Sequence, residues 1–217
     1  PMNASALLFP IPRSIRSSAG IVRLPPTLSL QGAPIPKWLC RRLARACQTA
    51  GTRLTPGAAA GVIHTTLTDR GFSGISDARL RSEAYRLTID MAGHVAVTSP
   101  APDGLQHGLI TLALMFEAAA AGARLAPLTI EDRPAFAVRG FQIDLAREFY
   151  PSTRFLKNMI DRAADLKFNT LWLYLENHFH APGLEDISTP GGMTPESVRE
   201  LSAYAAARGI DLVPGTN

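Results

Sequence analysis

The sequence predicts an α/β protein: an N-terminal α+β domain over residues 1–132, followed by parallel β/α units over residues 133–217. Hydrophobic residues make up 46% of the 217 residues and charged residues 18%, which indicates a packed core rather than a disordered chain. Apolar strands begin at positions 138, 170 and 210 and alternate with amphipathic helices, a spacing typical of parallel βαβ units. Before them, alternating apolar residues on both sides of a turn at residues 91–94 predict a β-hairpin.

The N-terminal domain is expected to contain a sheet with helices packed on one face. Apolar residues at helical spacing predict helices over residues 38–50 and 105–121, each followed by a glycine. The remaining segments are expected to be a first strand at 7–12, a strand at 59–68, a loop at 69–82, the hairpin at 85–97 and a connector at 122–137.

The second part contains three predicted strands at 138–145, 170–175 and 210–213, separated by helices at 152–167 and 194–209. Ser152 is placed to cap the first of these helices, and Pro195 takes the first position of the second. Two architectures fit this order: the opening of a truncated (β/α)8 TIM barrel, or a small open sheet. The third strand would be an unpaired edge, so we expect the 217 residues to be a fragment.

Charge and hydropathy argue against nucleic-acid and membrane partners. Residues 1–68 hold eight Lys or Arg and no Asp or Glu, but these are scattered and no series of aromatic residues accompanies them, which favours a solvated helix face. No run of about 18 apolar residues is present, so no membrane span is expected. Residues 7–12 are too short and too rich in proline for a signal peptide. Because the chain begins at Pro1, the removal of an earlier leader remains an open alternative. The choice between a cytoplasmic and an exported protein therefore also stays open.

The two cysteines are expected to be inert. Cys40 and Cys47 lie seven residues apart on one predicted helix, about 10 Å along its axis, which is too far for a disulfide. Neither has a CxxC partner or a nearby histidine, so buried free thiols are favoured over a metal or redox site.

Candidate chemistry lies where the predicted strands end, because working residues of parallel α/β folds gather at the carboxyl ends of the strands. The first strand ends in Asp144 and Arg147. Arg147 is placed to form an ion pair with Asp144 or Glu148, and alternatively Asp144 orients it. The second strand ends in Glu176, His178 and His180 beside aromatic residues, a mixture that suits carbohydrate. A metal held by these three is a weaker alternative, because Pro182 and Gly183 indicate a loop here. Phosphate-binding glycine loops and a GxSxG nucleophile motif are both missing from the sequence, and no metal or organic cofactor is expected.

Several motifs, in this order and spacing, resemble glycoside hydrolase family 20, the β-N-acetylhexosaminidases. Residues 139–151 are similar to the family's first barrel strand, patterned R-G-x-x-x-D-x-x-R-x-F, and residues 161–175 resemble the helix and second strand that follow. Upstream, residues 83–87, 103–112 and 130–134 resemble the family's N-terminal accessory domain and connector.

The resemblance implies that Arg147 binds ring hydroxyls of the terminal sugar, with Asp144 beside it. Many members have a histidine in place of Glu148, and a His-x-His-x-x-Asp-Asp run in place of residues 172–178. This chain is closer to a branch with Tyr-x-Glu, which makes Glu176 and His178 candidates for the substrate cleft. In the family the acetamido oxygen of the substrate attacks the anomeric carbon, assisted by an Asp-Glu pair that follows the fourth strand. The chain is therefore expected to hold no catalytic residue of its own.

The predicted function is the N-terminal part of a glycoside hydrolase that removes terminal β-linked N-acetylhexosamine from a glycan or oligosaccharide by substrate-assisted retention, with the fragment itself inactive. Two alternatives stay open. One is a non-catalytic carbohydrate-binding or interaction module on the same scaffold. The other is a different glycosidase with a similar accessory domain, such as an α-glucuronidase-like or O-GlcNAcase-like enzyme.

Overall fold

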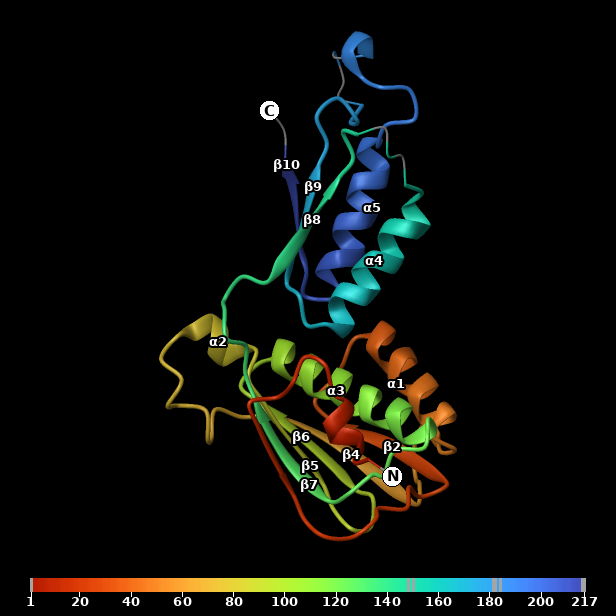
Figure 1. The fold of residues 1–217 in the computed structure, drawn as a ribbon, viewed down its shortest axis with the longest axis vertical. Helices are drawn as coiled ribbons and strands as arrows, with labels where there is room; N and C mark the ends of the chain where they lie inside the picture. Colours follow the sequence, from red (N-terminus) through yellow and green to blue (C-terminus); the bar gives the residue numbers. More distant parts are fainter. Residues whose placement is uncertain (1, 148, 150, 181–182, 184, 216–217) are drawn as a thin grey trace. The chain divides into compact units, whose positions relative to one another are not determined.

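The computed structural model describes the whole chain except residues 1, 148, 150, 181–182, 184 and 216–217. It divides into two compact units, Pro1–Ala137 and Val138–Asn217 (Figure 1). The boundary expected from the sequence, after residue 132, lies a few residues before this division.

The first unit is built on a mixed seven-stranded sheet with the order β1-β7-β5-β6-β4-β2-β3. Its strands are β1 (Ser14–Ser17), β2 (Thr27–Gly32), β3 (Arg53–Thr55), β4 (Gly61–Leu67), β5 (Tyr85–Ile89), β6 (Val95–Ser99) and β7 (Leu128–Asp132). The predicted hairpin is β5 and β6, which pair antiparallel with Ile89 opposite Val95. Strand β5 is also antiparallel to β7, whereas β6, β4, β2 and β3 are parallel to one another.

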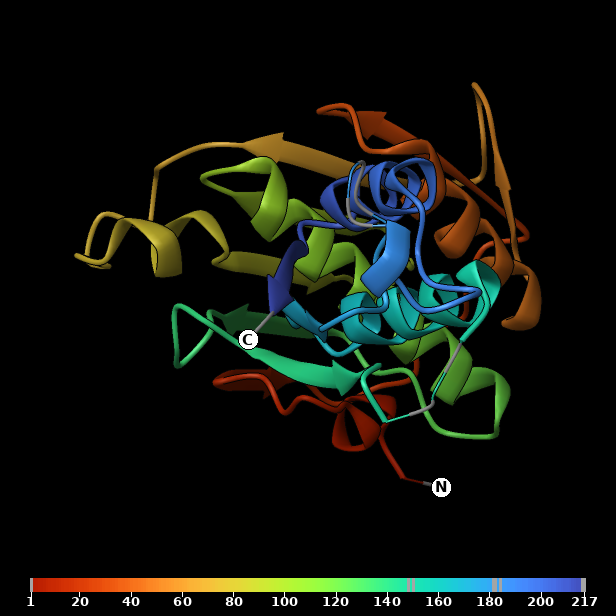
Figure 2. The same cartoon turned by 90° about the horizontal axis from the view of Figure 1, so that it is seen from above.

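Helices α1 (Lys37–Thr49) and α3 (Pro102–Ala120) cover one face of this sheet, as expected (Figures 1 and 2). The apolar stripe of α1 is fully buried at Leu39 and Leu43, and α3 buries a wider band that includes Leu109 and Phe116. The sheet and the two helices share one hydrophobic core, in which each fully buried side chain of this size contributes about 1.5–3 kcal/mol. Cys47 lies in this core, and burial raises the pKa of its thiol to about 12, which agrees with the inert thiol expected from the sequence.

Two expectations for the first unit were wrong. The apolar run at 7–12 forms no strand. Its first residue ends a 3-10 helix, η1 (Ala4–Leu7), and Pro10 and Pro12 lack the N–H that a sheet ladder needs. The connector at 122–137 contains β7, which lies inside the sheet between β1 and β5. Strand β7 shows the alternation of a strand, with Leu128 and Ile130 buried, but it is short and follows a proline directly.

The shorter elements complete the first unit. Helix α2 (Ala78–Ser82) interrupts the predicted loop at 69–82, and Asp77 caps it by accepting a hydrogen bond from the backbone N–H of Leu80 at 2.9 Å. The described residues contain no helix long and apolar enough to cross a membrane.

The second unit contains parallel β/α units, as predicted. Strands β8 (Gly140–Asp144), β9 (Thr170–Tyr174) and β10 (Asp211–Gly215) form a parallel sheet in the order β10-β9-β8. Between them run α4 (Thr153–Asp165) and α5 (Pro195–Ala206), with a 3-10 turn, η2 (Glu185–Ile187), before α5. The side chain of Ser152 accepts from the N–H of Phe155, and that of Thr194 accepts from the N–H of Ser197, both at 3.2 Å. Side-chain caps therefore start both helices.

Both helices lie on one face of this sheet (Figure 1). Leu171 and Leu173 are buried, whereas Trp172 and Tyr174, which alternate with them along β9, are only partly buried. A polar cluster joins the helices: Tyr204 donates to both carboxylate oxygens of Asp161 at 2.9 and 3.0 Å, and Nε of Arg208 donates to Asp161 Oδ1 at 2.6 Å. The Arg208 guanidinium also stacks 3.5 Å from the centre of the Tyr204 ring.

Strand β8 approaches β9 closely at Gly140. A Cβ at this position would lie 2.2 Å from the carbonyl oxygen of Thr170 and 2.6 Å from the indole of Trp172. Such contacts require the two strands to move apart, because neither neighbour is the free end of a flexible side chain.

We expect Gly140→Ala to lower the free energy of unfolding by about 1–3 kcal/mol, the usual cost of overpacking. The measurement is urea unfolding followed by tryptophan fluorescence, to which Trp172 contributes from beside the substitution. Gly74→Ala is the control, because no atom lies within 4 Å of its added methyl group and its φ is not positive. Equal stability of the two variants would contradict the close approach of β8 to β9.

Candidate functional site

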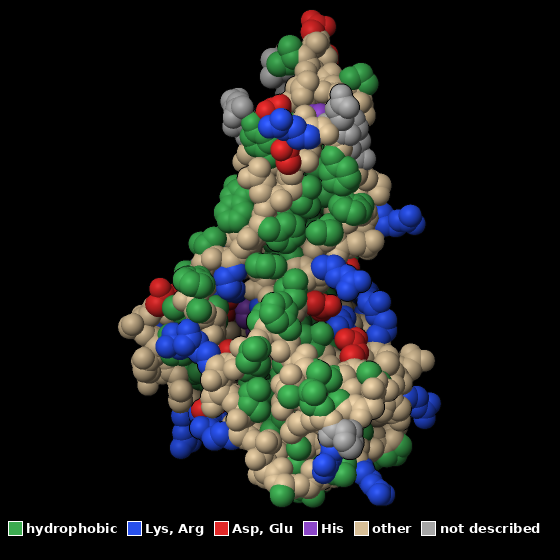
Figure 3. Space-filling model, viewed as in Figure 1, with side chains coloured by type: hydrophobic (Ala, Val, Ile, Leu, Met, Phe, Trp, Pro, Cys, Tyr) green, Lys and Arg blue, Asp and Glu red, His purple; other side chains and the backbone are tan. Residues whose placement is uncertain are grey.

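The candidate site lies at the carboxyl ends of β8 and β9, where the parallel register places Asp144 directly opposite Tyr174. Figure 3 shows basic and acidic side chains together at the end of the second unit where these strands stop. Residues opposite each other in register point to the same face of a sheet, so the two side chains share the face that the helices leave open.

Asp144 holds the start of the loop that carries Arg147. Its Oδ1 accepts a hydrogen bond from the backbone N–H of Ala146 at 2.9 Å, which closes a turn directly after the strand. Its Oδ2 lies 3.4 Å from Nε of Arg147. The Arg147 side chain is 81% exposed, so this pair adds little stability and leaves most of the guanidinium open to solvent.

Tyr174 and Glu176 form the second half of the site. The Tyr174 hydroxyl donates to Glu176 Oε1 at 2.7 Å. This bond to a carboxylate is the main reason that the pKa of the Tyr174 phenol is raised, with partial burial and the negative charges of Glu176 and Asp144 adding to it and Arg147 opposing it. Asp144 and Arg147 at the end of β8 and Glu176 at the end of β9 therefore all interact electrostatically with Tyr174.

The backbone at Glu176 has a φ of +45°, in the left-handed region that L-residues rarely adopt. Among the described non-glycine residues only Lys167 shares this feature, and it lies directly after the end of α4, where a left-handed residue is common. Glu176 follows a strand, so no helix end accounts for its conformation. Backbone strain of this kind is common at functional sites. In this conformation the carboxylate of Glu176 accepts the hydrogen bond from Tyr174.

His178 is in a different environment. It is 5% exposed, its N–H donates to the carbonyl of Leu175 at 2.8 Å, and its carbonyl accepts from the N–H of Met193 at 2.7 Å. The structure thus brings Asp144, Arg147 and Glu176 to an open surface and buries His178 within the loop between β9 and α5. In the described part of the chain, no group of three or more His, Cys, Asp or Glu is arranged to hold a metal ion. Glu148, the other predicted partner of Arg147, lies outside the described residues.

Tyr174 is the residue that the sequence prediction left out of the candidate site. The signal was present, because Trp172 and Tyr174 alternate with the buried leucines of β9 and therefore face away from the helices. Gly215 of β10 lies opposite Tyr174, and a Cβ there would meet the Tyr174 ring at 3.3 Å. The glycine leaves room for the ring on the open face.

An α+β unit followed by parallel β/α units, with arginine and carboxylates at the strand ends, is the arrangement expected of the opening of a (β/α)8 barrel protein. The chain belongs to glycosyl hydrolase family 20. The family model "Glycosyl hydrolase family 20, domain 2" matches residues 6–133, and the model of the family's catalytic domain matches residues 136–217. The resemblance found in the sequence is confirmed.

Relatives support the same family. The chain is 34% identical over 156 residues to a β-hexosaminidase of Akkermansia muciniphila, covering 62% of this chain and 31% of that protein. It is 30% identical over 178 residues to a β-N-acetylhexosaminidase of Cellulomonas fimi, covering 75% and 34%. The chain thus spans about a third of the length of these relatives.

Solved structures show the same fold. The chitobiase of Flavobacterium johnsoniae superposes with a TM-score of 0.73 at 21% identity, covering 99% of this chain and 35% of that one. A family 20 exo-β-N-acetylglucosaminidase of Vibrio harveyi, in complex with N-acetylglucosamine, superposes with a TM-score of 0.71 at 19% identity, covering 98% and 36%. The architecture is therefore an accessory domain followed by part of a barrel. The alternative of a small open sheet is rejected.

We expect Glu176→Gln to lower the pKa of Tyr174 toward the ordinary value of about 10, because the neutral amide removes the charged acceptor that favours the protonated phenol. Stabilisation from this bond is complete below pH 10 and is lost as the pH rises through the raised pKa of the folded state. The measurement is the pH dependence of phenolate absorbance, with Tyr174→Phe identifying the signal. Glu196→Gln, on α5, removes the same charge elsewhere and should leave the titration unchanged; an unchanged titration in Glu176→Gln as well would contradict the bond.

Proposed function

We propose that this chain is the N-terminal part of a β-N-acetylhexosaminidase, which removes terminal β-linked N-acetylhexosamine from a glycan by substrate-assisted retaining hydrolysis. The observation that carries the proposal is Arg147, which stands exposed at the carboxyl end of the first strand of the family 20 catalytic region. Stability does not account for an exposed arginine whose ion pair with Asp144, among the described residues, is 3.4 Å long, whereas a guanidinium fork suits the paired hydroxyls of a sugar ring.

Each residue of the site has a distinct role in this proposal. Arg147 donates to ring hydroxyls of the terminal sugar, and Asp144 orients it through the contact to Nε. Glu176, which accepts a hydrogen bond from Tyr174, is a further acceptor at the strand ends. His178 supports the loop from its buried position and reaches the substrate only through that loop.

The chemical step follows from the family. The acetamido oxygen of the substrate attacks the anomeric carbon while an acid protonates the leaving oxygen, and water then opens the cyclic intermediate. The Asp-Glu pair that assists these steps follows the family's fourth strand, and the second unit has three described strands. Sugar binding and bond cleavage are therefore separable in this chain.

We expect the 217-residue chain to bind N-acetylglucosamine weakly and Arg147→Ala to lose that binding, since the substitution removes the donors to the ring hydroxyls. Isothermal titration calorimetry is the measurement. Arg154→Ala, on the exposed face of α4, removes an equal charge without touching the strand ends and should bind as the parent does. Equal binding by Arg147→Ala and the parent would remove Arg147 from the site.

We also expect the 217-residue chain to release no chromophore from a chromogenic N-acetylglucosaminide, because it lacks the acid that protonates the leaving oxygen. The assay distinguishes the candidate functions. Clear hydrolysis by the pure chain would place a general acid within these residues and contradict this mechanism. Binding without hydrolysis is the outcome expected of an N-terminal part.

A further inference from the structure

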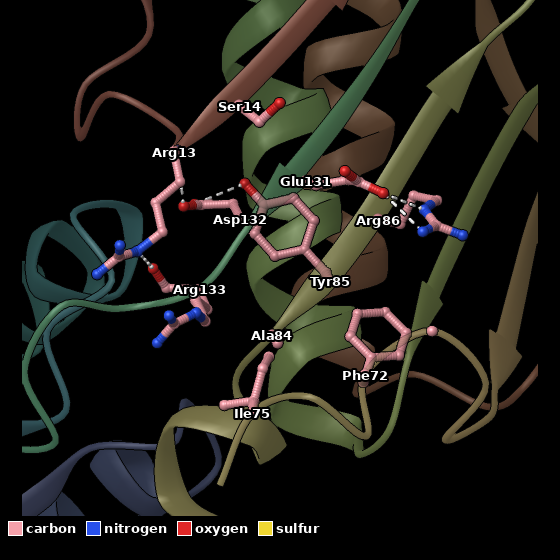
Figure 4. A pocket seen from close by; sticks show the side chains of 11 residues that line it. Arg13, Ser14, Phe72, Ile75, Ala84, Tyr85, Arg86, Glu131, Asp132 and Arg133 are labelled. Carbon is pink, nitrogen blue, oxygen red and sulfur yellow. Dashed lines mark hydrogen bonds and ion pairs between the residues drawn. The ribbon is translucent and has the colours of Figure 1, made fainter. Parts of the chain in front are cut away.

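A cavity of about 280 Å³ opens in the first unit, beside the ends of β5 and β7 and the loop that leads from β4 to α2 (Figure 4). Part of its lining is apolar and comes from that loop and the start of β5, namely Phe72, Ile75 and Ala84. Phe72 is 6% exposed, so this wall belongs to the fold rather than to a loose surface segment. The volume is at the lower limit of small-molecule sites, which limits a ligand to about the size of a monosaccharide.

Both carboxylates of the cavity are already held by neighbours. Glu131 accepts from Arg86 at 2.6 and 2.8 Å and from Arg16 at 2.8 Å, and these bonds lower the pKa of its carboxyl group, with Arg86 the larger influence. Asp132 Oδ1 accepts from the backbone N–H of Arg13 at 3.1 Å. Glu131 is thus paired with two cations, whereas the backbone N–H of Arg13 orients the carboxylate of Asp132.

Tyr85 fixes Asp132 from inside the core. Its hydroxyl donates to Asp132 Oδ2 at 3.0 Å and lies 2.8 Å from the hydroxyl of Thr111 on α3. Tyr85 is 1% exposed, and burial raises the pKa of its phenol well above the ordinary range, so it stays a neutral donor. Asp132 therefore presents a rigidly held carboxylate at the cavity, able to accept from hydroxyl groups of a ligand.

The cavity also holds two arginines whose charge is not matched. Nε of Arg13 donates to the backbone carbonyl of Arg133 at 3.0 Å, which ties the two residues together. In Figure 4 both side chains lie on the side of Tyr85 away from Arg86. Across the described residues, neither guanidinium has a carboxylate partner within ion-pair distance. Guanidinium groups that form no ion pair among the described residues can hold an anion, and the planar fork of arginine matches a carboxylate.

We propose that this cavity binds a small carboxylate-bearing sugar, a uronic acid, with its carboxylate at Arg13 and Arg133, its hydroxyls at Asp132 and its ring against Phe72 and Ile75. Every residue involved belongs to the first unit, whereas Arg147 belongs to the second. It stands independently of the proposed hydrolase activity.

The test uses the 217-residue chain with glucuronate as the probe, by isothermal titration calorimetry at low salt. Glucuronate is expected to bind saturably. Glucose, which has the hydroxylated ring but no carboxylate, and acetate, which has the carboxylate but no ring, are expected to bind at least tenfold more weakly. This comparison needs no variant. Equal binding of glucose or acetate, or no binding of glucuronate, would overturn the proposal.

Two variants then locate the site. Arg133→Gln and Arg13→Gln are each expected to weaken glucuronate binding at least tenfold without changing the melting temperature, because both side chains lie outside the core. Arg53→Gln is the matched control: it makes the same change on β3, at the opposite edge of the same sheet, and should bind as the parent does. Loss of binding in all three variants alike would show a general charge effect and reject the site, and so would unchanged binding in both cavity variants.

Discussion

The parallel register of β8 and β9 is the constraint on which the candidate site depends. It places Asp144 opposite Tyr174, and because residues opposite each other face the same side, it brings the polar ends of two strands together. A shift of one residue would turn Tyr174 toward the helices and Leu173 to the open face. The buried leucines of β9 and the close approach at Gly140 both oppose that shift, so the hydrophobic core also fixes the position of the site.

Much of the second unit could be predicted because local signals and packing agree there. Ser152 and Thr194 start their helices with the hydrogen bonds expected of cap residues, and the strands begin close to the predicted positions. Arg147 and Asp144 could be proposed as site residues from the sequence because polar residues that interrupt an apolar strand at its carboxyl end are rarely part of the core.

The features that could not be predicted from the sequence are decided by distant contacts. Strand β7 is five residues long, and its place inside the sheet depends on β1 and β5, which are remote in sequence. The burial of His178 likewise depends on Met193, whose N–H bonds to its carbonyl across the loop. Neither contact leaves a periodic signal in the sequence. A short strand or a loop histidine can therefore be assigned only when its partners are known.

The arginines of this protein separate by how completely their charge is matched. Arg208 is almost fully buried, stacks on Tyr204 and bonds to Asp161, a closed arrangement that explains its position by stability alone. Arg147 is exposed, and its ion pair with Asp144 is long, so among the described residues this contact adds little stability at the strand end. When an arginine is oriented by a neighbour but most of its N–H groups form no hydrogen bond within the protein, these donors can bind a ligand. Orientation by Asp144 without neutralisation at short range is therefore the strongest structural reason to regard Arg147 as a binding residue.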